Sequence, residues 1–157
     1  MEAFQPLYGN LWKFVLSITR DREAAKEILS ETVLIAYDKF DTLKNEKAFL
    51  SFLFTIASRL NNASKKKSSK YEFKENFEFD GFQGNLVSPE EAVDIDLLYK
   101  FLDKLPAQQK EALILFEVFG FSRKEIAEMQ NTNITNVKIR LYRGRKNLEK
   151  LLEEKSL

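Results

Sequence analysis

SRKEIAEMQNTNITNVKIRLYRGRKNLEKLL, residues 122–152, predicts two helices joined by a short turn. Ser122 followed by Glu125 has the spacing of a capping box, which predicts the start of a short first helix. Asn133 is placed to cap a second, longer helix. The apolar residues of that helix recur at helical spacing and are expected to face the core: Ile134, Val137, Leu141 and Leu148. Helix, three-residue turn and helix form a helix-turn-helix motif, whose second helix enters the DNA major groove.

The exposed side of the second helix is strongly basic. Residues 136–146 hold five basic and no acidic side chains. A charged face of this kind is often only solvated, but after a capped helix and turn we favour DNA binding, with an affinity that falls as salt rises. The expected contacts are Thr135, Asn136, Lys138, Ile139, Arg140, Tyr142, Arg143, Arg145 and Lys146.

Composition excludes several classes of chemistry. The 157 residues are 44% hydrophobic, which is enough for a packed core. With no cysteine and no histidine, the chain cannot form disulfides, common zinc sites, or Ser-His and Cys-His catalytic pairs. We therefore expect no cofactor and no metal. No long apolar stretch or signal peptide is visible, which predicts a cytoplasmic protein without membrane insertion.

The net charge of +1 hides a segregation of charge along the chain. Residues 65–70 hold four basic and no acidic side chains, whereas residues 71–103 hold nine acidic and two basic side chains. Two basic patches are therefore separated by an acidic middle, and such local patches can bind nucleic acid even when the net charge is small.

The periodicity of apolar residues predicts an all-α fold, with two small helical domains joined by a flexible linker. The N-terminal half is expected to hold three helices: residues 5–19, Asp21 to about Phe40, and about Asn45 to the run of lysines that ends at Lys67. The C-terminal half begins at a helix capped by Ser88, continues with a helix over about 107–119, and ends in the helix-turn-helix.

The predicted N-terminal helix from Asp21 to about Phe40 presents an unusual surface. An acidic stripe with one leucine is expected on its outer side, and Ile28, Leu29, Thr32, Ile35 and Ala36 are expected to face the core. Such a stripe suits a basic groove on a partner protein, although an ordinary solvated face remains an alternative. The stripe consists of Glu27, Ser30, Glu31, Leu34 and Asp38.

Two segments resemble the same protein family. LPAQQKEALILFEVFGFSRKEIAEMQNTNITNVKIRLYRGRKNLEKLL, residues 105–152, resembles region 4 of extracytoplasmic-function (ECF) sigma factors of bacterial RNA polymerase. DREAAKEILSETVLIAYDKFDTLKNEKAFLSFLFTIASRL, residues 21–60, resembles region 2 of that family. The resemblance implies the domains 1–64 (region 2), 65–88 (linker) and 89–157 (region 4). It also implies initiation of transcription at specific promoters rather than catalysis.

The resemblance implies partners and roles for named residues. The acidic stripe on the helix from Asp21 to about Phe40 would bind core RNA polymerase. Region 4 would bind the upstream element of promoter DNA. An anti-sigma factor would inhibit the chain. Region 2 would bind the core-promoter element, where unpaired bases are held by basic and aromatic side chains. Its candidates are Asn45, Lys47, Phe54, Arg59, Asn61, Asn62, Lys65, Lys66 and Lys67; Phe54 could equally be a core residue.

Some features depart from the family or remain open. Asn131 stands in the turn, where its tolerance of the left-handed conformation preserves the motif. Gln130 replaces a usual aliphatic residue, which predicts looser packing between the last two helices. The aromatic residues of the linker are expected to dock into a polymerase channel or an inhibitor, or to pack back on the domains: Tyr71, Phe73, Phe77, Phe79 and Phe82.

Two other functions remain alternatives to the interpretation as a sigma factor. A stand-alone helix-turn-helix regulator would bind an operator without polymerase, with the N-terminal half as a sensing or dimerising module. An enzyme would depend on paired carboxylates such as Glu27 and Glu31, or Glu90 and Glu91, but no glycine-rich phosphate loop accompanies them.

Overall fold

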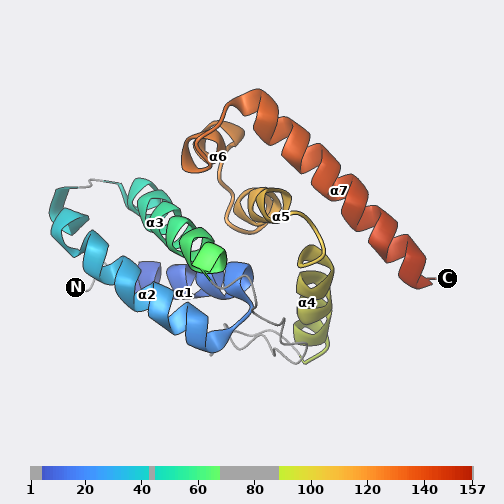
Figure 1. Ribbon diagram of the computed structural model, residues 1–157, viewed down its shortest axis with the longest axis horizontal. Helices are drawn as coiled ribbons and strands as arrows, with labels where there is room; N and C mark the ends of the chain where they lie inside the picture. The colour runs from blue at the N-terminus through green and yellow to red at the C-terminus, as the bar shows by residue number, and fades with distance from the viewer. Residues whose placement is uncertain (1–4, 43–44, 68–88, 157) are drawn as a thin grey trace. The chain divides into compact units, whose positions relative to one another are not determined.

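The computed structural model describes residues 5–42, 45–67 and 89–156. Every regular element in these ranges is helical, so the predicted all-α fold is confirmed. The chain divides into two compact units, Met1–Gly84 and Asn85–Leu157 (Figure 1). The predicted linker aromatics and the predicted cap Ser88 lie outside the described residues.

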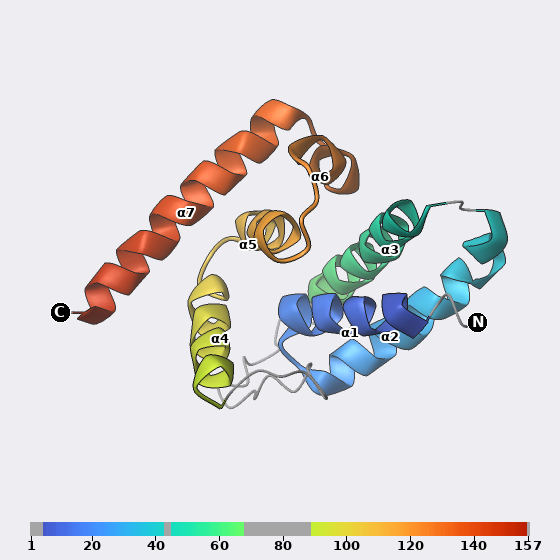
Figure 2. The same cartoon turned by 180° about the vertical axis from the view of Figure 1, so that it is seen from behind.

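The N-terminal unit is built from three helices that all pack against one another, α1 (Gln5–Thr19), α2 (Arg22–Ala36) and α3 (Glu46–Lys67) (Figure 2). A short 3₁₀ segment, η2 (Tyr37–Thr42), follows α2, so the α-helix ends four residues before the predicted end at Phe40. The third helix runs to the end of the lysine run, which makes the first residues of the predicted linker helical.

An aromatic stack forms the centre of this unit. The rings of Phe14 in α1 and Phe54 in α3 lie 4.2 Å apart between centroids, and their planes differ by only 8°. Both side chains are completely buried. Of the two alternatives for Phe54, the structure therefore supports the core residue, and the expectation that its ring is exposed for stacking on DNA bases is wrong. Leu11, Val15, Leu16 and Leu53 are further fully buried side chains of this unit.

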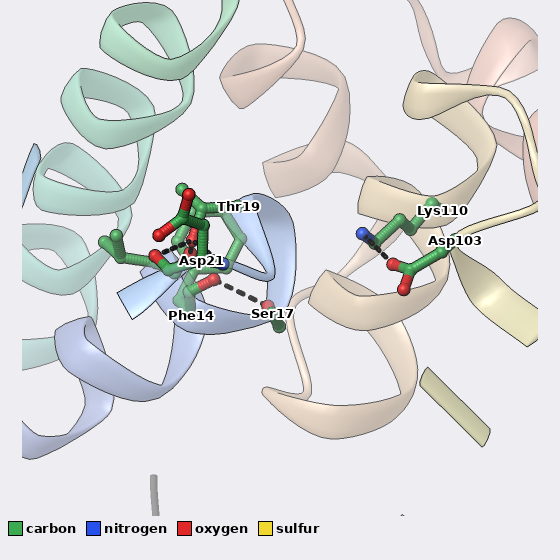
Figure 3. A network of polar contacts seen from close by, with 7 residues as sticks. Phe14, Ser17, Thr19, Asp21, Asp103 and Lys110 are labelled. Atoms are coloured by element: carbon green, nitrogen blue, oxygen red, sulfur yellow. Dashed lines mark hydrogen bonds and ion pairs between the residues drawn. The ribbon is translucent and has the colours of Figure 1, made fainter. Parts of the chain in front are cut away.

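The connection between α1 and α2 is held by local hydrogen bonds (Figure 3). The Thr19 hydroxyl donates to the Val15 carbonyl at 2.8 Å, and Arg20 takes the left-handed conformation with φ 55°. Asp21 is the N-cap of α2, because its Oδ1 accepts from the backbone N–H groups of Glu23 at 3.0 Å and Ala24 at 3.4 Å. The predicted start of the second helix is therefore confirmed.

The C-terminal unit contains α4 (Pro89–Leu102), α5 (Ala107–Leu113), α6 (Arg123–Met129) and the long α7 (Ile134–Ser156), which packs against the other three. A π-helical turn, η3 (Ile114–Val118), continues α5, and the Phe119 N–H donates to the Ile114 carbonyl at 3.3 Å. Gly120 then ends the segment at φ 73°, where its missing side chain allows the left-handed conformation.

The motif at the end of the chain has the predicted form. Ser122 Oγ accepts from the Glu125 N–H, and Glu125 Oε1 accepts from the Ser122 N–H, which completes the capping box. Asn131 has φ 53° in the turn, as its residue type predicts. A helix of seven residues, a tight turn and a helix of 23 residues therefore form a helix-turn-helix.

Candidate nucleic-acid interface

The inner side of α7 is fixed by small and branched residues. Val137 and Leu141 are 0% and 2% exposed. Gly144 follows on the same side, where an added Cβ would lie 2.9 Å from Leu113 Cδ1, so α5 and α7 approach closely at this glycine. Ile134 was expected on this side but is 42% exposed. As the first residue of the helix it directs its side chain back over the turn, because helical side chains tilt toward the N-terminus.

This orientation turns the basic side of α7 outward. Of the nine predicted contacts, only Arg140 is partly buried. The ammonium of Lys146 lies 5.8 Å from the centre of the Tyr142 ring, so these two side chains share one part of the surface. The exposed predicted residues are Thr135, Asn136, Lys138, Ile139, Tyr142, Arg143, Arg145 and Lys146.

The leading end of α7 is ordered by side chains of the turn. Asn133 Oδ1 accepts from the Asn136 N–H at 2.8 Å, which confirms the predicted cap. Asn136 Nδ2 donates to Thr132 Oγ1 at 2.8 Å, so the side-chain amide at the leading end of α7 is held by the turn. The N-terminal residues of a second helix of this kind are the ones that reach base edges in the major groove.

Gln130 connects three parts of the unit. Its Nε2 donates to the Gln108 carbonyl of α5 at 3.2 Å, and its Oε1 accepts from Arg140 Nη1 of α7 at 2.8 Å. From the sequence, Gln130 was noted only as a replacement for a usual aliphatic residue, which predicted looser packing between the last two helices. Its partners could not be predicted, because they lie 22 and 10 residues away.

The other edge of α7 meets the π-helical turn η3. Arg145 Nη2 lies 2.6 Å from Glu117 Oε1, and both side chains are about half exposed, at 45% and 54%. The Phe116 ring has two guanidinium groups nearby, with Arg123 at 4.8 Å and Arg145 at 5.6 Å from its centre. Phe116, Glu117 and Arg123 were not predicted from the sequence, since the π-helical turn that presents the first two has no clear sequence signal.

The predicted partner surface, which lies on α2 and the first turn of η2, is exposed throughout. Glu27, Ser30, Glu31 and Asp38 reach solvent, and Leu34 is 76% exposed. The burial of Ile28, Leu29, Thr32 and Ala36 was also predicted and is confirmed. Ile35 was expected in the core but is 48% exposed, and the neighbouring Tyr37 is 65% exposed. Both residues lie where α2 ends and η2 begins, so the apolar part of this surface is larger than predicted.

The predicted core-promoter residues on α3 are divided by burial. Asn61 is only 7% exposed, so its expected place on the surface is wrong, as it is for Phe54. One helix side of α3 faces α1 and α2, and the spacing of polar residues did not reveal that Asn61 belongs to it. The side chains of Lys66 and Lys67 lie outside the described part. The exposed candidates are Asn45, Lys47, Arg59, Asn62 and Lys65.

Asn45 also has a structural role. Its Oδ1 accepts from the Lys47 N–H at 2.8 Å and the Ala48 N–H at 3.4 Å, which caps α3. Within the described ranges, no three acidic side chains gather closely enough to hold a metal ion. None of the helices described is both long and apolar enough to cross a membrane.

Comparisons with known proteins agree with this geometry. The model of the family described as "Sigma-70, region 4" matches residues 95–148, which include the helix-turn-helix up to Leu148. The chain is 27% identical over 152 residues to the ECF RNA polymerase sigma factor SigM of Bacillus subtilis (strain 168), covering 96% of this chain and 93% of the relative. It is 28% identical over 147 residues to the ECF RNA polymerase sigma factor EcfG of Rhodopseudomonas palustris (strain TIE-1), covering 91% of this chain and 79% of the relative.

A solved structure has the same fold. It is the sigma factor RpoE in complex with the anti-sigma factor NepR from Bartonella quintana, with a TM-score of 0.77 and 23% identity. The match covers 97% of this chain and 95% of the other, so the likeness of fold includes both units.

Proposed function

The chain belongs to the ECF family of RNA polymerase sigma factors, and we propose that it binds core RNA polymerase and directs it to specific promoters. In this proposal residues 1–64 act as region 2, residues 89–157 act as region 4, and residues 65–88 link them. The chain then works in the cytoplasm, where bacterial polymerase meets DNA.

The outer side of α7 is the observation that carries this proposal. Val137, Leu141 and Gly144 face the core, so the basic residues of the helix face outward together. Neutralising phosphates with such residues releases counterions and supports binding at the upstream promoter element. Asn136, Arg140 and Arg143 follow one another at helical spacing and would lie along the floor of the major groove.

Region 2 would supply the other contacts. The exposed residues of α3, Asn45, Lys47, Arg59, Asn62 and Lys65, would bind the core-promoter element as the strands separate. Without Phe54, this binding depends on polar and basic groups rather than on the aromatic stacking first expected. Lys66 and Lys67 remain candidates by residue type alone.

The surface on α2 would bind core RNA polymerase. Leu34 is almost fully exposed among Glu27, Glu31 and Asp38, and an apolar residue surrounded by carboxylates suits a groove lined with basic side chains. An anti-sigma factor is a further expected partner, because the structurally similar RpoE was solved with one.

The rival functions have weaker support. A stand-alone regulator would leave the α2 surface and the similarity over 96% of the chain to SigM without explanation. For an enzyme, the paired carboxylates Glu27 and Glu31 of α2 lie on an exposed helix face, and the sequence has no histidine or cysteine to act with them. We therefore infer that the chain is not an enzyme.

Run-off transcription tests the proposal. Purified core polymerase is mixed with the full chain and a library of genomic fragments, and initiation from a defined set of fragments is expected only when both proteins are present. The variant Lys138→Ala, which removes an exposed basic group beside the row of residues proposed to line the major groove, should lower the log-log salt slope of promoter binding by about 0.9 while leaving core binding intact. Initiation from no fragment would refute the function, and specific operator binding without core enzyme would favour the stand-alone regulator.

A further inference from the structure

The side chain of Arg140 is held in place before any DNA is bound. It is the only basic residue among the nine predicted α7 contacts that is partly buried, and its Nη1 donates to Gln130 Oε1 at 2.8 Å. A free arginine loses rotational freedom when it contacts a base, which reduces the affinity gained. An arginine that is already held loses less of this freedom on binding.

The geometry also fixes which atom of Gln130 faces Arg140. The Nε2 of Gln130 donates to the Gln108 carbonyl at 3.2 Å, and a carbonyl can only accept. The amide oxygen is therefore the end directed to Arg140, and the guanidinium can only donate to it. Gln130 is thus held by the backbone of α5, and it in turn holds the side chain of Arg140 on α7.

Arg140 lies on the part of α7 where its orientation would affect which DNA base is recognised. Arg140 lies one turn after Asn136 and about one turn before Arg143, on the side that carries the predicted base contacts. Only one N–H of its guanidinium is used by Gln130, so others remain to donate. Arginine pairs best with the O6 and N7 acceptors of guanine, and this pairing requires a defined orientation of the fork.

We propose that Gln130 is a positioning residue that holds the guanidinium of Arg140 for reading one base pair, with guanine as the favoured base, in the upstream promoter element. This inference rests on the proposed function. It predicts that Gln130 affects the discrimination between bases at one position, although Gln130 itself does not touch DNA.

The experiment uses holoenzyme assembled from the full chain and core polymerase, on a promoter selected by run-off transcription. Each base pair of the upstream element is varied, and binding is measured for the wild type, Gln130→Met, Arg140→Ala and the double variant. Gln130→Met keeps the approximate volume of the side chain but removes its hydrogen bonds. It should reduce discrimination about twofold to tenfold at the base pair where Arg140→Ala also reduces it, and the double variant should lose no more than Arg140→Ala alone.

Two further variants separate positioning from general stability. Gln109→Met is the matched control, because Gln109 Oε1 also bridges α5 and α7 by accepting from Asn147 Nδ2 at 3.0 Å, but involves no basic residue. It should leave discrimination unchanged. Gln130→Glu retains an acceptor for Arg140 but loses the donor to the Gln108 carbonyl, so it should restore discrimination at the same base pair only in part, and its negative charge should lower affinity for all sequences.

Several results would overturn the inference. Gln130→Met could lower binding equally at every base pair, leave discrimination unaltered, or strengthen binding by releasing Arg140; each of these contradicts a positioning role. If Arg140→Ala changes discrimination at no base pair, Arg140 reads no base and the inference is also wrong. If wild-type holoenzyme initiates normally in these cases, the sigma-factor function stands and only the positioning role fails; if it initiates nowhere, both fail.

Discussion

Lys110 of α5 donates to Asp103, which follows α4, with 2.6 Å between Nζ and Oδ1 and only 11% and 5% of the two side chains exposed (Figure 3). Lys110→Met would leave a buried carboxylate without this partner, so we expect a loss of about 3–5 kcal/mol in the free energy of unfolding of the C-terminal unit. Urea unfolding followed by circular dichroism measures this loss.

A surface lysine provides the control for that variant. Lys100 pairs with Asp96 at 3.5 Å, but half of its side chain is exposed, so Lys100→Met should cost less than about 1 kcal/mol. The fluorescence of Trp12 reports the unfolding of the N-terminal unit. The urea concentration at the midpoint of that transition should be the same in both variants as in the parent chain. Equal effects of Lys100→Met and Lys110→Met would contradict the role of the buried pair.

Gly144 lies where α7 comes close to α5, and it is the one described glycine at which an added Cβ would meet another side chain. A Cβ there would lie 2.9 Å from Leu113 Cδ1 and 3.3 Å from its Cγ, so Gly144→Val should destabilise the C-terminal unit by about 1–3 kcal/mol through overpacking. In α1, a Cβ added at Gly9 would have no atom within 4 Å. Gly9→Val should therefore stay within about 0.5 kcal/mol of the parent, as its helix propensity predicts.

Phe54 belongs to the core of the N-terminal unit. Phe54→Ala removes a fully buried ring from the stack with Phe14, and we expect a loss of about 3–5 kcal/mol, measured by urea unfolding and Trp12 fluorescence. Arg59 is exposed on the same helix, so Arg59→Ala should change stability by less than about 0.5 kcal/mol but reduce promoter opening. A stable Phe54→Ala protein that fails only in promoter opening would restore the stacking role.

If Arg145 binds promoter DNA as proposed, Glu117 would compete with DNA phosphates for its guanidinium. The two groups are 2.6 Å apart at a half-exposed site, so Glu117→Gln should release the guanidinium and raise affinity for duplex DNA about 1.5-fold to 5-fold at low salt. Holoenzyme binding at several salt concentrations measures this change. Glu149→Gln removes an exposed carboxylate elsewhere on α7 and serves as the control. A lower affinity for Glu117→Gln would mean that Glu117 instead holds Arg145 in its binding position.

Leu34 is the most exposed large apolar side chain of the described residues, at 76%. If it anchors the polymerase contact, Leu34→Ala should weaken core binding about 5-fold to 30-fold without lowering stability, as is typical of an apolar anchor at an interface. Competition with a labelled wild-type chain for core polymerase measures this effect. Val118→Ala, which truncates a side chain that is 40% exposed in the other unit, should bind as the wild type does.

Local signals in the sequence were enough to predict much of this protein. The caps at Asp21, Ser122 and Asn133 and the left-handed Asn131 depend on neighbours within a few residues, and the structure has each of them in the predicted form. Helical periodicity also predicted the all-α fold and the inner position of Val137 and Leu141, because burial of an apolar stripe requires only one facing helix.

Only the tertiary structure decided which side chains hold or cover one another. Periodicity could not tell that Phe54 and Asn61 are buried while Ile35 and Ile134 are exposed, since this depends on where neighbouring helices end. The contacts of Arg140 with Gln130 and of Arg145 with Glu117 join residues 10 and 28 positions apart. The sequence by itself determined the helices, their caps and the basic side of α7, because these arise from interactions between near neighbours. The fold determined how each arginine on that side is held, because this requires segments distant in the sequence to meet.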